Sequence, residues 1–225
     1  MEPKKPLLFL VVVLMLFFSV SAISIGQELK TLAILPFENN SVTEPEKYDP
    51  LSKGLSAMLI TDLAGSSDDL KIIEREKIAA IIKEIALGQS GSVDESTAIE
   101  VGKILGAQTI AFGSFMVLGK QVRIDMRIVK VETSETILGD SVTGDSDEFI
   151  ELERELARKI SESLQVAYAS RSGEPSSGID AALLFSQGLD ALDRGDKDTA
   201  KKLFSECVAK DASYQAQVDN VKGLD

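Results

Sequence analysis

Carboxylates are the side chains in this sequence whose types and spacing suggest acid–base or metal chemistry. Glu74, Glu76 and Glu84 lie near one another in the chain, and Arg75 separates the first two. Such carboxylates can form a general acid–base pair or bind a divalent cation. The alternative is structural: Arg75, at a strand-to-helix junction, pairs with a carboxylate, and Glu84 faces solvent. We favour the structural interpretation.

The rest of the sequence offers little catalytic chemistry. It contains no histidine, which excludes serine–histidine triads and histidine-based zinc motifs. The phosphate-binding pattern G-x-x-x-x-G-K-[ST] is absent, and the segment Gly88-Gln-Ser-Gly91 follows a helical pattern, so we interpret it as a helix stop and turn. We therefore expect no enzyme activity, no cofactor and no metal site.

Charge and cysteine content narrow the possible partners. A formal net charge of -12 and a sequence pI near 4.6 argue against nucleic acid as a ligand and against docking on an anionic lipid surface. Cys207 is the only cysteine, so an intramolecular disulfide cannot form. Its apolar neighbours favour a buried, inert thiol, and an intermolecular disulfide is the alternative.

Strands and helices alternate in the first half of the chain. Residues 29–37 are nearly all apolar or small, as in a strand that is covered on both faces. Asp49-Pro50 indicates the start of a helix that ends at Gly65-Ser66, and a short strand follows at 70–73. From Glu76, isoleucines at i, i+3, i+4 and i+7 predict an amphipathic helix whose apolar stripe is core: Ile78, Ile81, Ile82 and Ile85.

Hairpins dominate the following segment. A capped helix from about Asp94 stops at Gly106, and strands at 109–118 and 121–131 are joined by the tight turn Gly119-Lys120. A third strand at 136–143 and a helix over 146–169 complete the unit. The predicted fold class is α/β, a mixed sheet with packed helices.

These segments together resemble the CsgG family, the curli production assembly and transport components of the bacterial envelope. The resemblance rests on Leu32-Ala-Ile-Leu-Pro-Phe37, on the segment from Lys71 through Arg75 to Gly91, and on 94–114, and it covers about Lys30 to Ala167. It implies binding and assembly work without catalysis.

The N-terminal residues predict export. Residues 1–22 are typical of a signal peptide: Lys4 and Lys5 precede an apolar run from Leu7 to Phe18, and small residues follow up to Ala22. An uncleaved anchor is the alternative. No Cys follows the run, so we expect no lipid anchoring of the kind that the pore-forming curli member has.

The C-terminal part predicts a small helical hairpin. Residues 170–178 form a linker between a domain at 30–169 and a helix pair with tail at 179–225. Within the second part, residues 179–212 match the length of one tetratricopeptide repeat. Gly188 and Ala200 would let the two helices approach closely, and Phe204 would fill the space between them. A single pair must stack on the first domain, on another copy or on a partner. We expect a docking element, with Leu184 and Phe204 as candidate interface residues and a first domain that folds without it.

A second candidate interface lies on one predicted strand. Arg123, Asp125 and Arg127 alternate with apolar residues, so the charges share one face of the sheet. This face is either solvated or a subunit interface. The resemblance suggests the second possibility, because CsgG-type domains associate side by side in rings.

The sequence thus favours a non-catalytic exported protein at the periplasm or the periplasmic face of the outer membrane. Its expected partners are envelope or secretion proteins, a homo-oligomer is possible, and nucleic acid is not expected. The alternative is an oligomeric outer-membrane secretion pore subunit.

Overall fold

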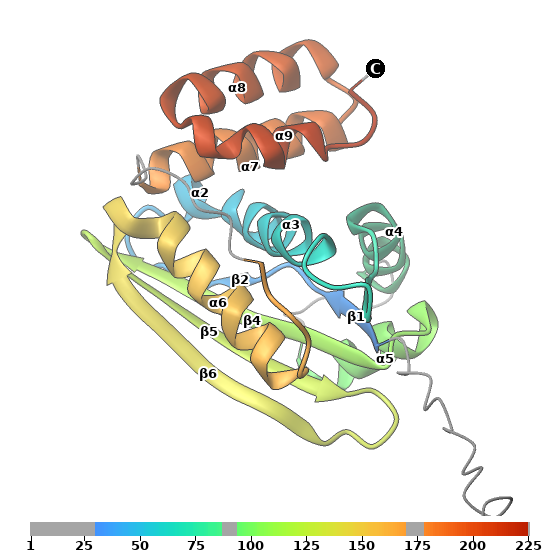
Figure 1. Ribbon diagram of the computed structural model, residues 1–225. Helices are drawn as coiled ribbons and strands as arrows, with labels where there is room; N and C mark the ends of the chain where they lie inside the picture. The colour runs from blue at the N-terminus through green and yellow to red at the C-terminus, as the bar shows by residue number, and fades with distance from the viewer. Residues whose placement is uncertain (1–29, 87–93, 170–177, 225) are drawn as a thin grey trace, which may run out of the picture.

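The computed structural model describes residues 30–86, 94–169 and 178–224, which form a mixed sheet with helices on both faces (Figure 1). The strands are β1 (Lys30–Ile34), β2 (Glu38–Asn39), β3 (Leu70–Ile72), β4 (Thr109–Leu118), β5 (Gln121–Lys130) and β6 (Thr136–Asp145). The helices of the first part are α2 (Pro45–Tyr48), α3 (Leu51–Ala64), α4 (Arg75–Ala86), α5 (Glu95–Leu105), the 3-10 turn η1 (Ser146–Glu148) and α6 (Phe149–Ser163). The C-terminal part holds α7 (Ile179–Asp193), α8 (Lys197–Lys210), the 3-10 turn η2 (Ala212–Tyr214) and α9 (Gln215–Asp219).

The sheet combines parallel and antiparallel strands in the order β3-β1-β4-β5-β6. The short strand β2 also pairs with β4, on the same side as β1. β1 runs parallel to both β3 and β4, whereas β4, β5 and β6 form an antiparallel meander. Gly119 takes a φ of 62° in the turn between β4 and β5, which is the backbone conformation that the Gly-Lys pair predicts. The α/β fold class is thereby confirmed.

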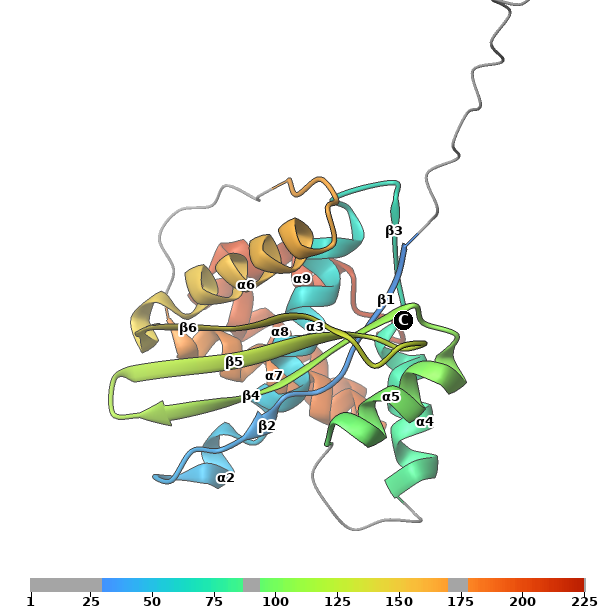
Figure 2. The same cartoon turned by 90° about the horizontal axis from the view of Figure 1, so that it is seen from below.

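Two apolar cores lie on opposite faces of the sheet. On one face α3 and α6 cover residues such as Phe115 and Ile124, and on the other face α4 and α5 cover Leu35, Ile110 and Val129. Figure 2 shows α4 and α5 over one end of this second face. β1 contributes side chains to both cores, as expected for a strand covered on both sides.

The C-terminal helices form a third layer that packs on the first part of the chain (Figure 1). α7 lies along α3, and Gly54 of α3 allows this close approach, because a Cβ there would lie 1.7 Å from Ser186 Oγ. Gln217 Nε2 of α9 donates a hydrogen bond of 2.7 Å to Asp62 Oδ1 of α3, and both residues are buried. The helix pair therefore stacks on the first domain, which is one of the three arrangements that the sequence left open.

Several boundaries differ from the expected ones. Residues 38–49, where the sequence pattern predicts no helix or strand, contain β2 and α2. Asp49 does not cap α3, and its carboxylate accepts a hydrogen bond from Asn39. α6 ends at Ser163, before Gln165, which has a φ of 52°, so the expected helix to 169 was too long. Residues 1–29, including the predicted signal peptide, lie outside the described residues. Within the described ranges, no helix is both long and apolar enough to cross a membrane.

Candidate functional site

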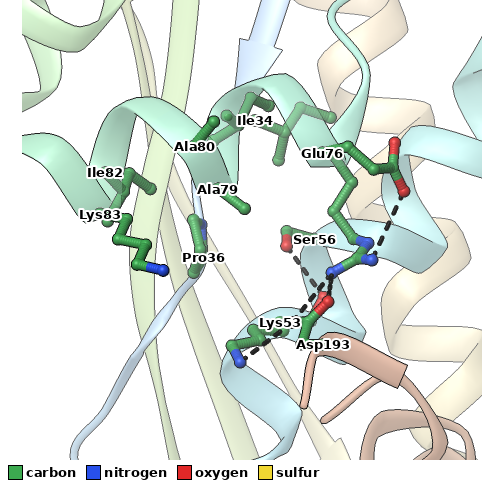
Figure 3. A pocket seen from close by; sticks show the side chains of 12 residues that line it. Ile34, Pro36, Lys53, Ser56, Glu76, Ala79, Ala80, Ile82, Lys83 and Asp193 are labelled. Atoms are coloured by element: carbon green, nitrogen blue, oxygen red, sulfur yellow. Dashed lines mark hydrogen bonds and ion pairs between the residues drawn. The ribbon is translucent and has the colours of Figure 1, made fainter. Parts of the chain in front are cut away.

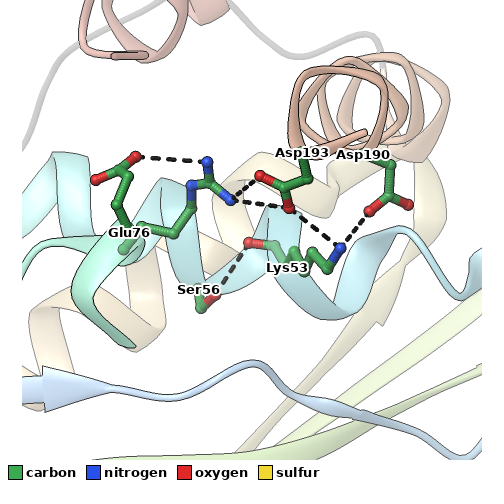
Figure 4. Close-up of polar contacts among 6 residues, drawn as sticks. Lys53, Ser56, Glu76, Asp190 and Asp193 are labelled. Carbon is green, nitrogen blue, oxygen red and sulfur yellow. Dashed lines mark hydrogen bonds and ion pairs between the residues drawn. The ribbon is translucent and has the colours of Figure 1, made fainter. Parts of the chain in front are cut away.

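A network of ion pairs joins α3, α4 and α7 (Figure 4). Arg75, the first residue of α4, donates from Nη1 to both carboxylate oxygens of Asp193, at 3.0 and 3.2 Å, and its Nη2 lies 3.4 Å from Glu76. Lys53 of α3 donates from Nζ to Asp190 at 2.7 Å and to Asp193 at 3.2 Å. The prediction that Arg75 pairs with a carboxylate is confirmed, and its bidentate partner comes from the C-terminal hairpin.

The network favours the charged form of the Lys53 side chain. Partial burial alone would lower the pKa of the Lys53 ammonium, but the hydrogen bonds and negative charges of Asp190 and Asp193 outweigh it and raise this pKa above its ordinary value. Lys53 is therefore a structural cation and differs from a general base, whose pKa would have to fall toward neutrality.

The three carboxylates that could perform acid–base chemistry have different surroundings. Glu74 Oε1 accepts a hydrogen bond of 2.5 Å from Lys222, and this bond holds the pKa of Glu74 below its ordinary value. Glu76 contacts Arg75, and Glu84 is exposed, as predicted. A general acid needs a raised pKa, so the environment of Glu74 opposes that role. Among the described residues, no cluster of three or more His, Cys, Asp or Glu could hold a metal ion.

A cavity of about 510 Å³ lies beside this network (Figure 3). Its apolar wall comes from the end of β1 and from α4, and its polar wall comes from α3, α4 and α7. The apolar lining residues are Ile34, Pro36, Ile78, Ala79, Ala80 and Ile82, and the polar ones are Lys53, Ser56, Arg75, Glu76, Lys83 and Asp193. Of the predicted isoleucine stripe, Ile78 is buried, whereas Ile81, Ile82 and Ile85 are only partly buried. The stripe therefore packs on the second core as expected, but only Ile78 lies fully inside that core, and Ile81, Ile82 and Ile85 lie at its edge.

The charged face of β5 lies beyond the part of the sheet that α4 and α5 cover. We call Arg123, Asp125 and Arg127 the β5 surface. Arg123 Nε donates to Asp125 Oδ2 at 2.8 Å, and Arg127 Nη1 lies 3.4 Å from Glu95 Oε2 at the start of α5. The side chains of the β5 surface are 46 to 62% exposed. The structure thus brings these three residues together on one open face.

The C-terminal candidates lie inside the helical hairpin. Phe204 of α8 is 2% exposed and packs against Gly188 of α7, where a Cβ would lie 2.5 Å from its ring. Ala200 is fully buried, and Leu184 is partly buried against the main core. Cys207 is also buried, and this burial raises its pKa to about 12. The thiol is thus buried, as expected.

The remaining motif residues concern helix ends. Gly106 ends α5 with a φ of 64°, and the Asp94 carboxylate at the other end accepts a hydrogen bond of 2.8 Å from Thr97 N. Both assignments are confirmed. Gly88 and Gly91 lie outside the described residues.

Sequence reasoning missed four charged residues of this site. Lys53, Asp190, Asp193 and Lys222 lie up to 169 positions apart, since they span residues 53 to 222. The one available signal was the spacing of Asp190 and Asp193, which places both carboxylates on the same face of a helix. Nothing in that spacing identifies their cationic partners.

The family comparison concerns the first half of the chain. Residues 18–123 match the family model described as "Curli production assembly/transport component CsgG". The match ends at Arg123 in β5, earlier than the expected limit near Ala167, and leaves β6, α6 and the C-terminal helices outside it. A comparison with curated proteins gave no match.

Solved structures show distant similarity. The lipoprotein GNA1162 from Neisseria meningitidis has 16% identity and a TM-score of 0.40, and the alignment covers 60% of this chain and 98% of that one. The LpoB C-terminal domain from Salmonella enterica has 15% identity and a TM-score of 0.36, with 52 and 84% covered. TolB from Acinetobacter baumannii has 13% identity and a TM-score of 0.40, with 61 and 28% covered. With TM-scores below 0.5, these likenesses assign no function to the chain.

Proposed function

We propose that this protein is a non-catalytic, exported envelope protein that acts in protein–protein assembly or secretion at the periplasm or the periplasmic face of the outer membrane. The observation that carries the proposal is the match of residues 18–123 to the curli assembly and transport family model. The charge pattern of the candidate carboxylates agrees with it, because each of Glu74 and Glu76 lies next to a cation.

The β5 surface is the proposed assembly interface, and its occupant is a second copy of this chain. The surface carries two arginines, and its carboxylates are Asp125 and the adjoining Glu95. A face with both signs of charge is complementary to itself when two copies are related by a two-fold axis. Its ion pairs are exposed, so they contribute little within one copy and can exchange for contacts to the second.

Charge reversal at the interface provides the test. We would purify the full chain and its Arg123→Glu/Arg127→Glu variant and measure their masses by light scattering over a range of concentrations. Lys202→Glu, on the exposed side of α8, introduces the same type of charge change away from the surface. We expect wild type and Lys202→Glu to associate and the double variant to remain a 24.2 kDa monomer.

Two results would count against the proposal. A wild-type protein that is monomeric at every concentration removes the self-association interface. Cell fractionation that recovers the protein from the cytosol, and none from the envelope, removes the exported role.

A further inference from the structure

The cavity between β1, α3, α4 and α7 has the size and lining of a ligand site. Its volume of about 510 Å³ falls within the range of small-molecule pockets, about 300 to 1,000 Å³. Such pockets combine a mostly apolar wall with a few polar groups that orient the ligand. Figure 3 shows this combination, with Pro36, Ala79 and Ile82 on one side and the Lys53–Asp193 pair on the other.

The charges of the cavity are compensated at one end only. Arg75 and Lys53 form ion pairs with Asp193, Asp190 and Glu76, with N···O distances of 2.7 to 3.4 Å. Lys83 lies eight residues after Arg75, about 12 Å further along α4. It is exposed at the cavity and forms no ion pair with any residue that the structure describes. An anionic group would therefore find its partner at the Lys83 end.

The apolar wall lies between these two ends. Ala79 and Ile82 fall on the turns of α4 that separate Arg75 from Lys83, and Ile34 at the end of β1 and Pro36 just after it face the same space. Because alanine leaves room beside the helix backbone, an apolar chain can lie along α4 here and remove these side chains from water.

We infer that the cavity binds a single-chain anionic amphiphile, a fatty-acyl carboxylate, with its chain along Ala79 and Ile82 and its carboxylate at Lys83. The wall formed by Asp193 and Lys53 belongs to the C-terminal hairpin and α3, so a bound chain contacts both α4 and the hairpin-bearing side of the molecule. Binding to the folded state only would raise the melting temperature as ligand concentration increases.

Calorimetric titration of the full chain with dodecanoate, kept below its micelle concentration, tests this inference. Dodecanol and dodecyltrimethylammonium provide the same chain with no charge and with positive charge. We expect dodecanoate to bind most tightly, and Lys83→Gln to weaken it about 5-fold, the upper range for an exposed ion pair. Ala79→Leu fills the cavity and should weaken binding about 10-fold or more.

Matched variants separate this site from other apolar surfaces. Lys77→Gln, on an exposed turn of α4 outside the cavity lining, and Ala209→Leu, exposed on α8, should leave dodecanoate affinity unchanged. The inference is overturned if dodecanoate does not bind, if the three amphiphiles bind equally, or if Ala79→Leu leaves affinity intact while circular dichroism shows a folded protein. These outcomes leave the proposed assembly role untouched, because it rests on the β5 surface.

Discussion

At the scale of single residues, Asp193 connects α7 to both α3 and α4. Its carboxylate accepts hydrogen bonds from Arg75 of α4 and Lys53 of α3, while its own backbone ends α7. Arg75 is the more deeply placed cation, with a side chain 14% exposed. Removing the carboxylate would leave this guanidinium with Glu76 alone, at 3.4 Å.

We predict that Asp193→Asn destabilises the folded chain by about 1 kcal/mol, because partly exposed ion pairs contribute at most about this much. Urea denaturation of the full chain measures the change in the free energy of unfolding. Glu100→Gln, on the exposed face of α5, removes one negative charge without a described partner and should change stability by less than about 0.5 kcal/mol.

The dependence of this stability difference on salt and pH provides a second test of the Asp193→Asn prediction. The difference between wild type and Asp193→Asn should shrink at high salt, because ions screen the pairs. The two aspartates raise the pKa of Lys53, so its contribution is fully present below the ordinary value of 10.5 and is lost as pH rises through the higher folded value. A difference that is insensitive to both would mean that Asp193 acts through packing instead of charge.

At the scale of elements, the contact between α3 and α7 depends on one glycine. Gly54 faces Ser186, whose Oγ donates a hydrogen bond of 2.6 Å to Ala182 O and is buried. A Cβ at position 54 would also lie 2.7 Å from Ser186 Cβ, so rotation of the serine cannot remove the overlap. The two helices must move apart to accept any side chain there.

Gly54→Ala should therefore destabilise the protein by about 2 to 3 kcal/mol, the upper part of the range for overpacking, despite the better helix propensity of alanine. Thermal melts followed by circular dichroism would report it. Gly65→Ala, at the end of the same helix with no atom within 4 Å of its Cβ, is the control and should be nearly neutral. Adding Ser186→Gly to Gly54→Ala should recover part of the loss, and failure to recover any would locate the strain elsewhere.

Elements with local signals were predictable from the sequence. The Asp94 cap, the Gly106 stop and the Gly119-Lys120 turn each act within a few residues of the chain, so neighbours distant in the sequence do not alter them. The two residues of β2 offered no such signal, because their hydrogen bonds depend on β4 more than 70 positions away. Alternation along β5 correctly placed Arg123, Asp125 and Arg127 on one face of the strand.

The candidate site was less predictable than the fold. A paired Arg75 followed from its position after a strand, but the nearest carboxylates in sequence, Glu74 and Glu76, are not its bidentate partner. That partner is 118 residues away, and which helix faces which is decided by tertiary packing. For the same reason the apolar stripe of α4 identified a helix but not the cavity beside it.

At the scale of the whole molecule, the main apolar core includes residues on both sides of the 170–177 segment. It joins Leu55, Met58 and Leu59 of α3 to Phe185 and Leu189 of α7. The expectation that the first domain folds without the hairpin therefore differs from the observed packing, in which α7 covers one side of α3. Removing the hairpin would expose that side of α3 to water.

We predict that a chain ending at residue 169 does not reach a stable native state, because it loses this apolar burial together with the partners of Arg75 and Lys53. Calorimetry and circular dichroism would compare it with the full chain, for which we expect a single cooperative transition. Phe204→Ala, which empties a buried position inside the hairpin, should lower the midpoint of that one transition by the equivalent of about 3 to 5 kcal/mol. A truncated chain that melts cooperatively at the wild-type temperature would show that the two parts are independent.

The position of the hairpin on α3 also fixes when the protein can finish folding. Synthesis proceeds from the N-terminus, so α3 and α4 leave the ribosome well before the residues that cover them. Until Ile179–Asp193 has emerged, the face of α3 around Gly54 lacks its native cover and the guanidinium of Arg75 lacks Asp193. The later segment thus completes a core that the earlier one begins, and a nascent chain of this protein remains incompletely folded until Ile179–Asp193 has been made.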